Sequence, residues 1–198
     1  FLHLQGAYAI SMEYFPSHTL SGEIPDNKPM PLDKVLRFSR DMATGMTVAH
    51  QAGVIHRDLK PANVLVNEEG LLKIVDFGVA AAASSGDTQL TKTGYVIGSP
   101  KYMAPEQILG KKVDETADVY SVGVIMYEMA TGVPPYSRGD HMSVMYQHVQ
   151  GKATDCQEIN PDIPDGLASV ISKAMSVDKS KRYQSMEELT DALDAVTL

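Results

Sequence analysis

The sequence has little of several features that define particular classes of protein. It has one cysteine, Cys156, so it can form no internal disulfide, and we expect a reducing, cytoplasmic setting. Because no histidine lies close to Cys156 in sequence, we expect a surface or loop thiol and not a nucleophile. The most apolar window, residues 119–130, is interrupted by Tyr120, Ser121 and Glu128 and is too short to span a membrane.

Charge of one sign is not concentrated anywhere in the chain. The 17 lysines and arginines and the 25 aspartates and glutamates give a formal net charge of −8. This acidic balance argues against nucleic acid or an anionic membrane as a partner, since their phosphates would be repelled. It does not exclude ATP, because a small anion responds to local charge. The histidines show no metal-ligand spacing, which argues against zinc, and residues 1–10 lack the basic start of a signal peptide.

The pattern of apolar residues indicates one domain with more helix than strand. Two short apolar runs, residues 1–4 and 7–13, predict a β-hairpin, and a turn-rich stretch over 19–31 follows. A long helix is predicted over 31–51, with Pro31 in its first turn and Gly53 at its end. The remaining elements expected are a hairpin over 64–66 and 71–75, a buried central helix over 115–130, and helices over 141–149, 167–175 and 186–196. Ser185 and Glu188 have the spacing of a capping box at the start of the last helix.

The most specific pattern is the run His56-Arg57-Asp58-Leu59-Lys60-Pro61-Ala62-Asn63, in which an asparagine lies five residues after an aspartate. Asp76-Phe77-Gly78 and then Ala104-Pro105-Glu106 follow in the chain. These three motifs in this order resemble the serine/threonine protein kinase family. The residues from Asn160 to Pro164 and from Arg182 to Ser185 are similar to the eukaryotic-like kinases of bacteria.

The resemblance implies a mainly α (α+β) fold, the helical C-terminal lobe of a protein kinase with short β-hairpins. It identifies residues 56–63 as the catalytic loop and 76–106 as the activation segment. Asp58 would accept the proton of a serine or threonine hydroxyl on a protein substrate, and Lys60 would place a cation beside the transferring γ-phosphate of ATP. Asn63 and Asp76 would be the oxygen ligands of Mg²⁺.

Three further roles are structural and follow from the same resemblance. His56 is expected to pack against Phe77, and not to act as a base. Asp118, at the start of the central helix, is expected to anchor the backbone of the catalytic loop. Arg182 is expected to form a buried ion pair with Glu106, which is costly to break from one side.

The resemblance also assigns the nucleotide pocket. Leu65 matches the residue that packs beneath adenine. Met12 matches the gatekeeper position, and Glu13 and Tyr14 match the hinge that borders the nucleotide.

Regulation is implied by the threonines of the activation segment. Thr91 and Thr93 lie where activating phosphorylation usually occurs, and a phosphate there could bind Arg57 through charge-assisted hydrogen bonds. The alternative is that these threonines only solubilise a loop. Ser99 lies in the peptide-docking part of the segment and should hydrogen-bond Lys60 and Asp58.

The sequence lacks the glycine-rich loop of the family, because it contains no Gly-x-Gly, and its first lysine, Lys28, comes after the hinge. We therefore expect residues 1–18 to be a remnant of N-lobe strands and hinge, and 19–198 to be the C-lobe, with the N-lobe mostly absent. Such a fragment should have little activity, because positioning supplies most of the rate. The unprotected edges of its first hairpin should favour self-association.

Two other functions remain open from the residues. One is a non-catalytic peptide-docking or scaffold module, against which the intact Asp58, Lys60, Asn63 and Asp76 argue. The other is a small-molecule phosphotransferase, whose relatives usually lack the Ala-Pro-Glu segment that this chain has at 104–106.

Overall fold

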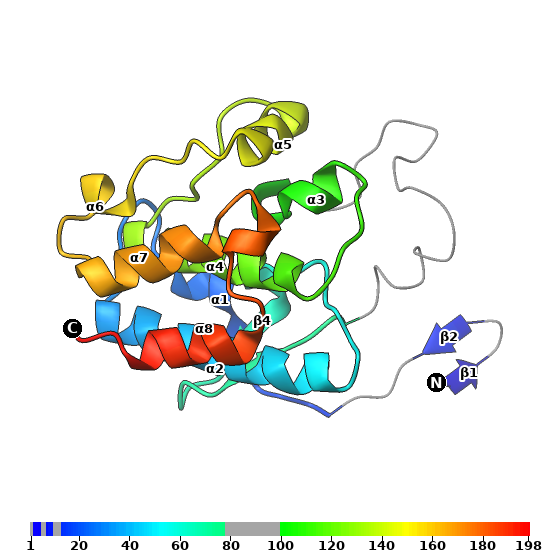
Figure 1. Cartoon of the computed structure of the whole chain (residues 1–198). Coiled ribbons are helices and arrows are strands. Elements are labelled where there is room, and N and C mark those ends of the chain that lie inside the picture. Colours follow the sequence, from blue (N-terminus) through cyan, green and yellow to red (C-terminus); the bar gives the residue numbers. More distant parts are fainter. Residues whose placement is uncertain (1, 5–6, 10–12, 78–99) are drawn as a thin grey trace.

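The protein is mainly helical, with a small antiparallel sheet (Figure 1). The computed structural model describes residues 2–4, 7–9, 13–77 and 100–198, and side chains from residue 13 onward within these ranges. Four residues singled out above, Met12, Thr91, Thr93 and Ser99, lie outside the described residues.

The helices and the strands are numbered separately along the chain. The helices are α1 (Leu20–Glu23), α2 (Leu32–Gln51), α3 (Pro105–Ile108), α4 (Thr116–Thr131), α5 (His141–Gln150), α6 (Cys156–Ile159), α7 (Asp165–Ala174) and α8 (Met186–Asp194). The strands are β1 (Leu2–Leu4), β2 (Ala7–Ala9), β3 (His18–Thr19), β4 (Val64–Val66) and β5 (Leu72–Ile74). Short 3-10 turns occupy Pro61–Asn63, Pro100–Tyr102 and Lys179–Lys181.

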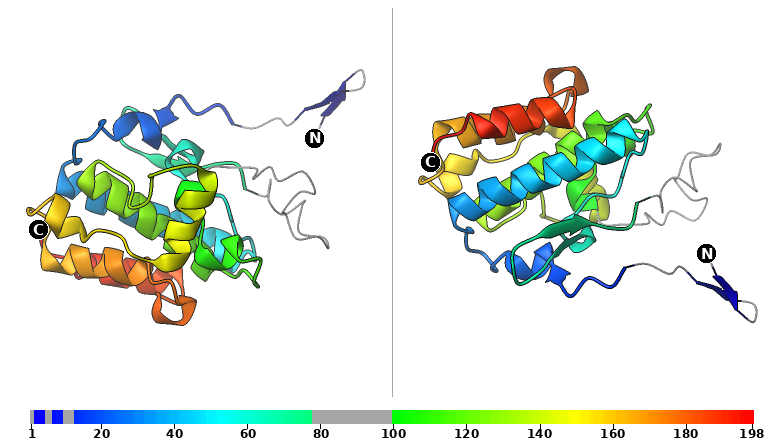
Figure 2. Two further views of the ribbon diagram at one scale, coloured as in Figure 1. Left: turned by 90° about the horizontal axis from the view of Figure 1, so that it is seen from above. Right: turned by 90° about the horizontal axis from the view of Figure 1, so that it is seen from below.

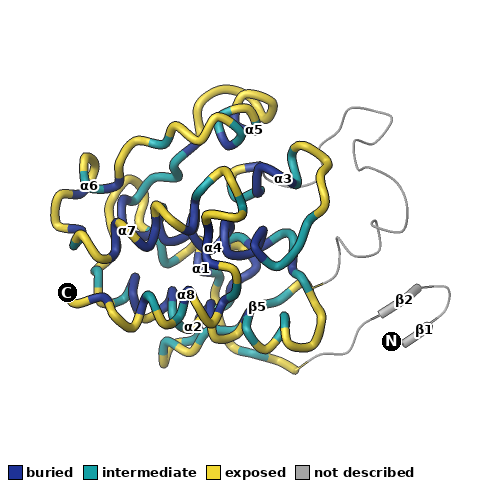
Figure 3. The backbone as a smooth tube through the Cα atoms, viewed as in Figure 1, coloured by how far each residue is buried: buried dark blue, intermediate teal, exposed yellow. Residues whose placement is uncertain are grey.

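The central helix α4 forms the middle of the core. All of its residues except Glu128 are buried, as Figure 3 shows by its dark colour. It packs against α7 on one side and α2 on another. Gly132 ends it with a φ of 79°, a left-handed conformation that glycine adopts without strain. A side chain there would also collide with the backbone of Lys28, only 2.4 Å from the position of a Cβ.

Helix α2 lies between α8 and the β4–β5 hairpin (Figure 2). Its buried face carries Val35, Met42 and Met46, which are spaced so that they point to the same side of the helix. Pro31 precedes the first turn, and Gly53, with a φ of 75°, follows the last. The predicted helix is confirmed with its bounds shifted by one residue.

The sheet has three strands in the order β3-β4-β5. The hairpin of β4 and β5 was predicted, and β3 was not. Leu65 lies in its middle strand, opposite Thr19 on one side and Lys73 on the other. Strands β1 and β2 form a separate antiparallel pair in the register Leu2↔Ala9. The predicted turn-rich stretch contains α1, and the short helices α3 and α6 were also missed.

Two local predictions need correction. The capping box of α8 is only half formed: the Ser185 hydroxyl accepts a hydrogen bond from the Glu188 amide, but the Glu188 carboxylate accepts from the Gln184 amide instead of from Ser185. Cys156 is not a surface or loop thiol. It is 5% exposed in the first turn of α6, and burial raises its pKa to about 11.

Candidate active site

One buried carboxylate binds the backbone at the start of the loop over residues 56–63. Asp118, in the first turn of α4, is fully buried. Its two oxygens accept hydrogen bonds from the backbone amides of His56 and Arg57, both at 2.9 Å. A third bond, of 2.8 Å, joins it to Nε2 of His50 on α2. A rigid core helix therefore fixes the start of the loop, as a precise site requires.

Asp58 stands at the centre of the loop and remains accessible. Its Oδ2 accepts a hydrogen bond of 2.6 Å from Nζ of Lys60, and its side chain is 41% exposed. Asn63 donates from Nδ2 to the Asp58 carbonyl at 2.9 Å and, more weakly, to its carboxylate at 3.4 Å. The carboxylate is thus oriented by two donors while solvent, or a substrate hydroxyl, can still reach it.

Asp76 lies at the same end of the β4–β5 hairpin as Asn63. Asn63 directly precedes β4, and its carbonyl accepts a hydrogen bond of 2.9 Å from the amide of Val75, the neighbour of Asp76. The backbone at Asp76 has a φ of 63°, and at Arg57 a φ of 65°, a region that residues other than glycine rarely adopt. Such strain is typically found where a side chain must be presented for function.

Both ring nitrogens of His56 bond the backbone. Its Nε2 bonds the carbonyl of Val75 at 2.9 Å, and its Nδ1 accepts from the amide of Asp58 at 3.3 Å. The ring centroid lies 4.8 Å from that of Phe77, so the histidine connects the loop over residues 56–63 to the segment that follows β5.

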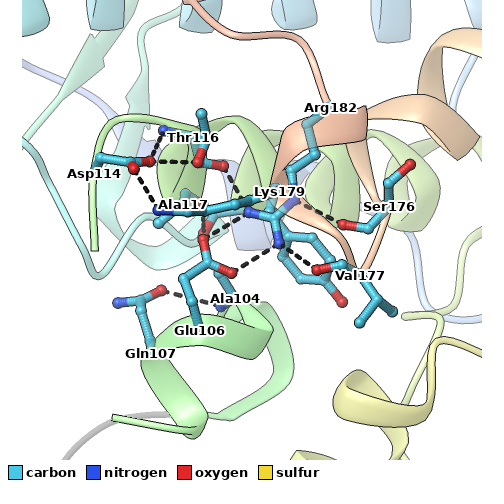
Figure 4. A network of polar contacts seen from close by, with 12 residues as sticks. Ala104, Glu106, Gln107, Asp114, Thr116, Ala117, Ser176, Val177, Lys179 and Arg182 are labelled. Carbon is cyan, nitrogen blue, oxygen red and sulfur yellow. Dashed lines mark hydrogen bonds and ion pairs between the residues drawn. The ribbon is translucent and has the colours of Figure 1, made fainter. Parts of the chain in front are cut away.

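A buried ion pair ties α3 to the segment before α8 (Figure 4). Arg182 donates to both carboxylate oxygens of Glu106, at 2.7 and 2.8 Å. Its other bonds go to the carbonyls of Ser176, Thr116 and Val177. The next residue along α3, Gln107, donates from Nε2 to the carbonyl of Arg57 at 2.8 Å. The ion pair therefore supports a helix that directly contacts the loop over residues 56–63.

The residues expected around adenine are brought only partly together. Leu65 is half-buried in β4, and its cross-strand neighbour Lys73 forms an ion pair of 2.6 Å with Glu13. Glu13 therefore reaches the same part of the sheet as Leu65. Tyr14, by contrast, is 86% exposed.

Sequence reasoning missed the polar contacts of Tyr102. The hydroxyl of Tyr102 donates to the carboxylate of Glu128 at 2.6 Å, and Ser121 donates to the Tyr102 carbonyl at 2.8 Å. Burial raises the pKa of both Tyr102 and Glu128 above their ordinary values. A signal was available, because Glu128 is a carboxylate that interrupts the apolar run over residues 122–130. Gln107 gave no comparable signal.

The donor set fits Mg²⁺ better than a metal held by an all-protein cage. Within the described ranges, no cluster of three or more His, Cys, Asp or Glu side chains could hold a metal ion. Asn63 and Asp76 offer two hard oxygen ligands, and Mg²⁺ in nucleotide sites commonly takes one or two carboxylates together with phosphates and water.

Comparison with known proteins shows the family of the chain. The profile of the protein kinase domain matches residues 1–193, so the chain belongs to the protein kinase domain family. Among its relatives are probable serine/threonine-protein kinases of Clostridium acetobutylicum, 37% identical over 187 residues, and of Clostridium perfringens, 38% identical over 187 residues. Each alignment covers 94% of this chain and 28% or 27% of the relative. The serine/threonine-protein kinase PknB of Mycobacterium leprae is 37% identical over 180 residues, 91% of this chain and 29% of that protein.

The relatives confirm the predicted similarity to eukaryotic-like serine/threonine kinases of bacteria. The chain spans less than a third of the length of these curated relatives. In the described part of the chain, no helix combines the length and apolar character that crossing a membrane requires.

Proposed function

We propose that the chain is the C-terminal lobe of a protein serine/threonine kinase, which transfers the γ-phosphate of ATP to serine or threonine hydroxyls of proteins. In this proposal residues 19–198 are the lobe and residues 1–18 are a remnant of N-lobe strands and hinge. The observation that carries it is the arrangement around Asp58, where Lys60 lies 2.6 Å from the carboxylate and Asn63 joins it to the end of the hairpin that bears Asp76. Membership of the kinase family supports the same function.

The chemistry assigned to each residue follows from its surroundings. Asp58 accepts the proton of the attacking hydroxyl, and its exposure leaves room for that hydroxyl. Lys60 is already beside the carboxylate and places positive charge where the phosphoryl group is transferred. Asn63 orients Asp58 through its amide nitrogen, which leaves its amide oxygen for a metal.

Asn63 and Asp76 would hold Mg²⁺, which when bound neutralises charge on the nucleotide phosphates. Leu65 would pack beneath adenine, with Met12, Glu13 and Tyr14 along its edge. A need for ATP places such an enzyme in the cytoplasm.

Regulation in this proposal acts on the activation segment. Phosphorylation of Thr91 or Thr93 would bring a dianion to Arg57, whose backbone is already fixed by Asp118 and Gln107. Ser99 would hydrogen-bond Lys60 and Asp58 and so align the substrate peptide.

A phosphotransfer assay on two proteins tests the function. One is this chain alone, and the other is the same chain joined to an N-terminal lobe that carries a glycine-rich loop and a nucleotide-binding lysine. We expect activity in the joined protein and little in the chain alone, because positioning the phosphates supplies much of the rate. Asp58→Asn should abolish the activity, whereas Asp26→Asn, at an exposed turn, should not. Comparable rates with and without the added lobe would refute the dependence on it.

The alternative, a non-catalytic docking or scaffold module, predicts a different result. Calorimetry of the joined protein would then give no heat with ATP and Mg²⁺, and Asp76→Asn would change nothing. A kinase should instead lose most of its metal-dependent nucleotide binding in this variant.

Self-association is proposed through the β1–β2 hairpin. In the part of the chain that the structure describes, neither strand pairs with a third strand, so each has an outer edge that can accept another chain. Light scattering at increasing concentration should detect dimers or larger species. A monomer at millimolar concentration would contradict the proposal.

A further inference from the structure

A cleft lies apart from the catalytic loop, between the loop over residues 133–138, helix α5 and the segment over 152–159. Its volume is about 620 Å³, and none of residues 56–63 nor Asp76 lines it. Two hydrogen bonds join its walls. Gln147 of α5 donates to the carbonyl of Arg138 at 2.7 Å, and Tyr127 of α4 donates to the carbonyl of Thr154 at 2.8 Å. The cleft is therefore formed before any ligand arrives, which lowers the entropy lost on binding.

The lining combines apolar surface with charge of one sign. Tyr146 is 64% exposed and Ile159 is 40% exposed, and Pro134 adds a rigid apolar wall. Among the residues that the structure describes, the charged ones that line the cleft are two cations, Arg138 and Lys152. Exposed large apolar side chains gathered beside a polar rim are typical of protein interaction sites.

Two cations without a carboxylate are unexpected in a chain that has 25 acidic and 17 basic residues. Neither Arg138 nor Lys152 forms an ion pair with any residue that the structure describes. The nearby aspartates cap helices and keep their charge, but they do not line the cleft: Asp140 accepts from the amide of Ser143, and Asp155 from the amide of Gln157. The side chains that line the cleft therefore carry two positive charges and no negative one, on an acidic protein.

We propose that this cleft binds a short acidic segment of a partner protein that carries an apolar side chain. Carboxylates of the segment pair with Arg138 and Lys152, and the apolar side chain packs between Tyr146 and Ile159. Nucleic acid does not suit the site, because two cations on a chain of net charge −8 neutralise too few phosphates. The site requires neither nucleotide nor Asp58, so it recruits the partner independently of phosphoryl transfer.

Fluorescence anisotropy with the full chain tests the proposal without nucleotide. The probe is a labelled hexapeptide of glutamate and aspartate with one central phenylalanine, at low and at physiological salt. We expect saturable binding that weakens with salt. The double variant Arg138→Glu/Lys152→Glu should bind about tenfold or more weakly, since each exposed charge pair contributes up to about fivefold and reversal adds repulsion. Tyr146→Ala, or a serine in place of the peptide's phenylalanine, should also weaken binding several-fold.

The matched control is Lys111→Glu/Lys112→Glu, which changes the net charge equally at exposed positions outside the cleft. It should bind the probe as the unchanged protein does, and thermal unfolding should show that both double variants fold. Equal weakening in the two double variants would indicate diffuse electrostatic attraction and overturn the proposal. No binding by the unchanged chain at millimolar peptide would overturn it as well.

Discussion

Replacing Arg182 with methionine should destabilise the protein more than almost any other single change. The Arg182 side chain is fully buried, the Glu106 side chain is 6% exposed, and the two form a bidentate pair with nitrogen–oxygen distances of 2.7 and 2.8 Å. Methionine would keep part of the apolar stem but leave the carboxylate buried without a partner. The carbonyls of Thr116 and Ser176 would also lose their donors.

The size of the effect follows from the cost of an uncompensated buried charge, about 3–5 kcal/mol when one partner of such a pair is removed. For a chain of this length each kcal/mol corresponds to roughly 2–4 °C in melting temperature. The expected loss is therefore about 6–20 °C. The double variant Arg182→Met/Glu106→Leu should lose much less than the sum of the two single changes, because it leaves no buried charge.

Urea unfolding at pH 7, followed by circular dichroism, measures all three variants. Lys179→Met is the matched control, because Lys179 pairs with Asp114 at 2.6 Å but both side chains are about 40% exposed. Its loss should stay below about 1 kcal/mol. The reasoning fails if Arg182→Met is as mild as this control, or if the double variant is as unstable as the sum of the single ones.

Three further results are expected. Burial lowers the pKa of His148 to about 4 from 6.5, so on acidification the imidazole takes up a proton at a higher pH in the unfolded chain than in the folded one. The free energy of unfolding should therefore keep its full value above pH 6.5 and fall by about 3 kcal/mol toward pH 4. In urea titrations His148→Gln should show a smaller dependence of this free energy on pH. Cys156, with its pKa raised, should react with iodoacetamide at pH 8 far more slowly in the native protein than in urea; equal rates would contradict its burial. Gly123→Ala should destabilise by about 1–3 kcal/mol because its Cβ would lie 2.9 Å from that of Ala174, whereas Gly166→Ala, with 3.8 Å of space, should not; the two melting temperatures decide this.

Long periodic segments of the sequence predicted the fold well. Helices α2 and α4 were expected within one residue of their observed bounds, because each is long enough for its apolar pattern to be read along several turns. Helices α1, α3 and α6 have four residues each, and β3 has two. Elements of that length are not stable by themselves and form only when tertiary contacts hold them, so their sequences contain no such pattern.

In the candidate site, too, some contacts could be predicted from the sequence and others could not. The motif residues are contiguous in sequence, and the structure brings Asp118 to the catalytic loop and Arg182 to Glu106, although the catalytic and regulatory roles stay predictions. The contact between Gln107 and the Arg57 carbonyl joins residues 50 positions apart and leaves no trace in spacing. Cys156 was assigned wrongly because the lack of a nearby histidine in the sequence does not bear on burial, which depends on tertiary packing.

The left-handed backbone at Arg57 and Asp76 has a consequence for attempts to improve this protein. Glycine adopts this backbone conformation without strain, so a screen for more stable variants should select Arg57→Gly and Asp76→Gly early. Each gain of that kind would remove a charged group from the place where it is displayed. At these two positions selection for stability would favour glycine, whereas selection for the charged group favours the residue with the strained backbone, and the chain has the charged residue.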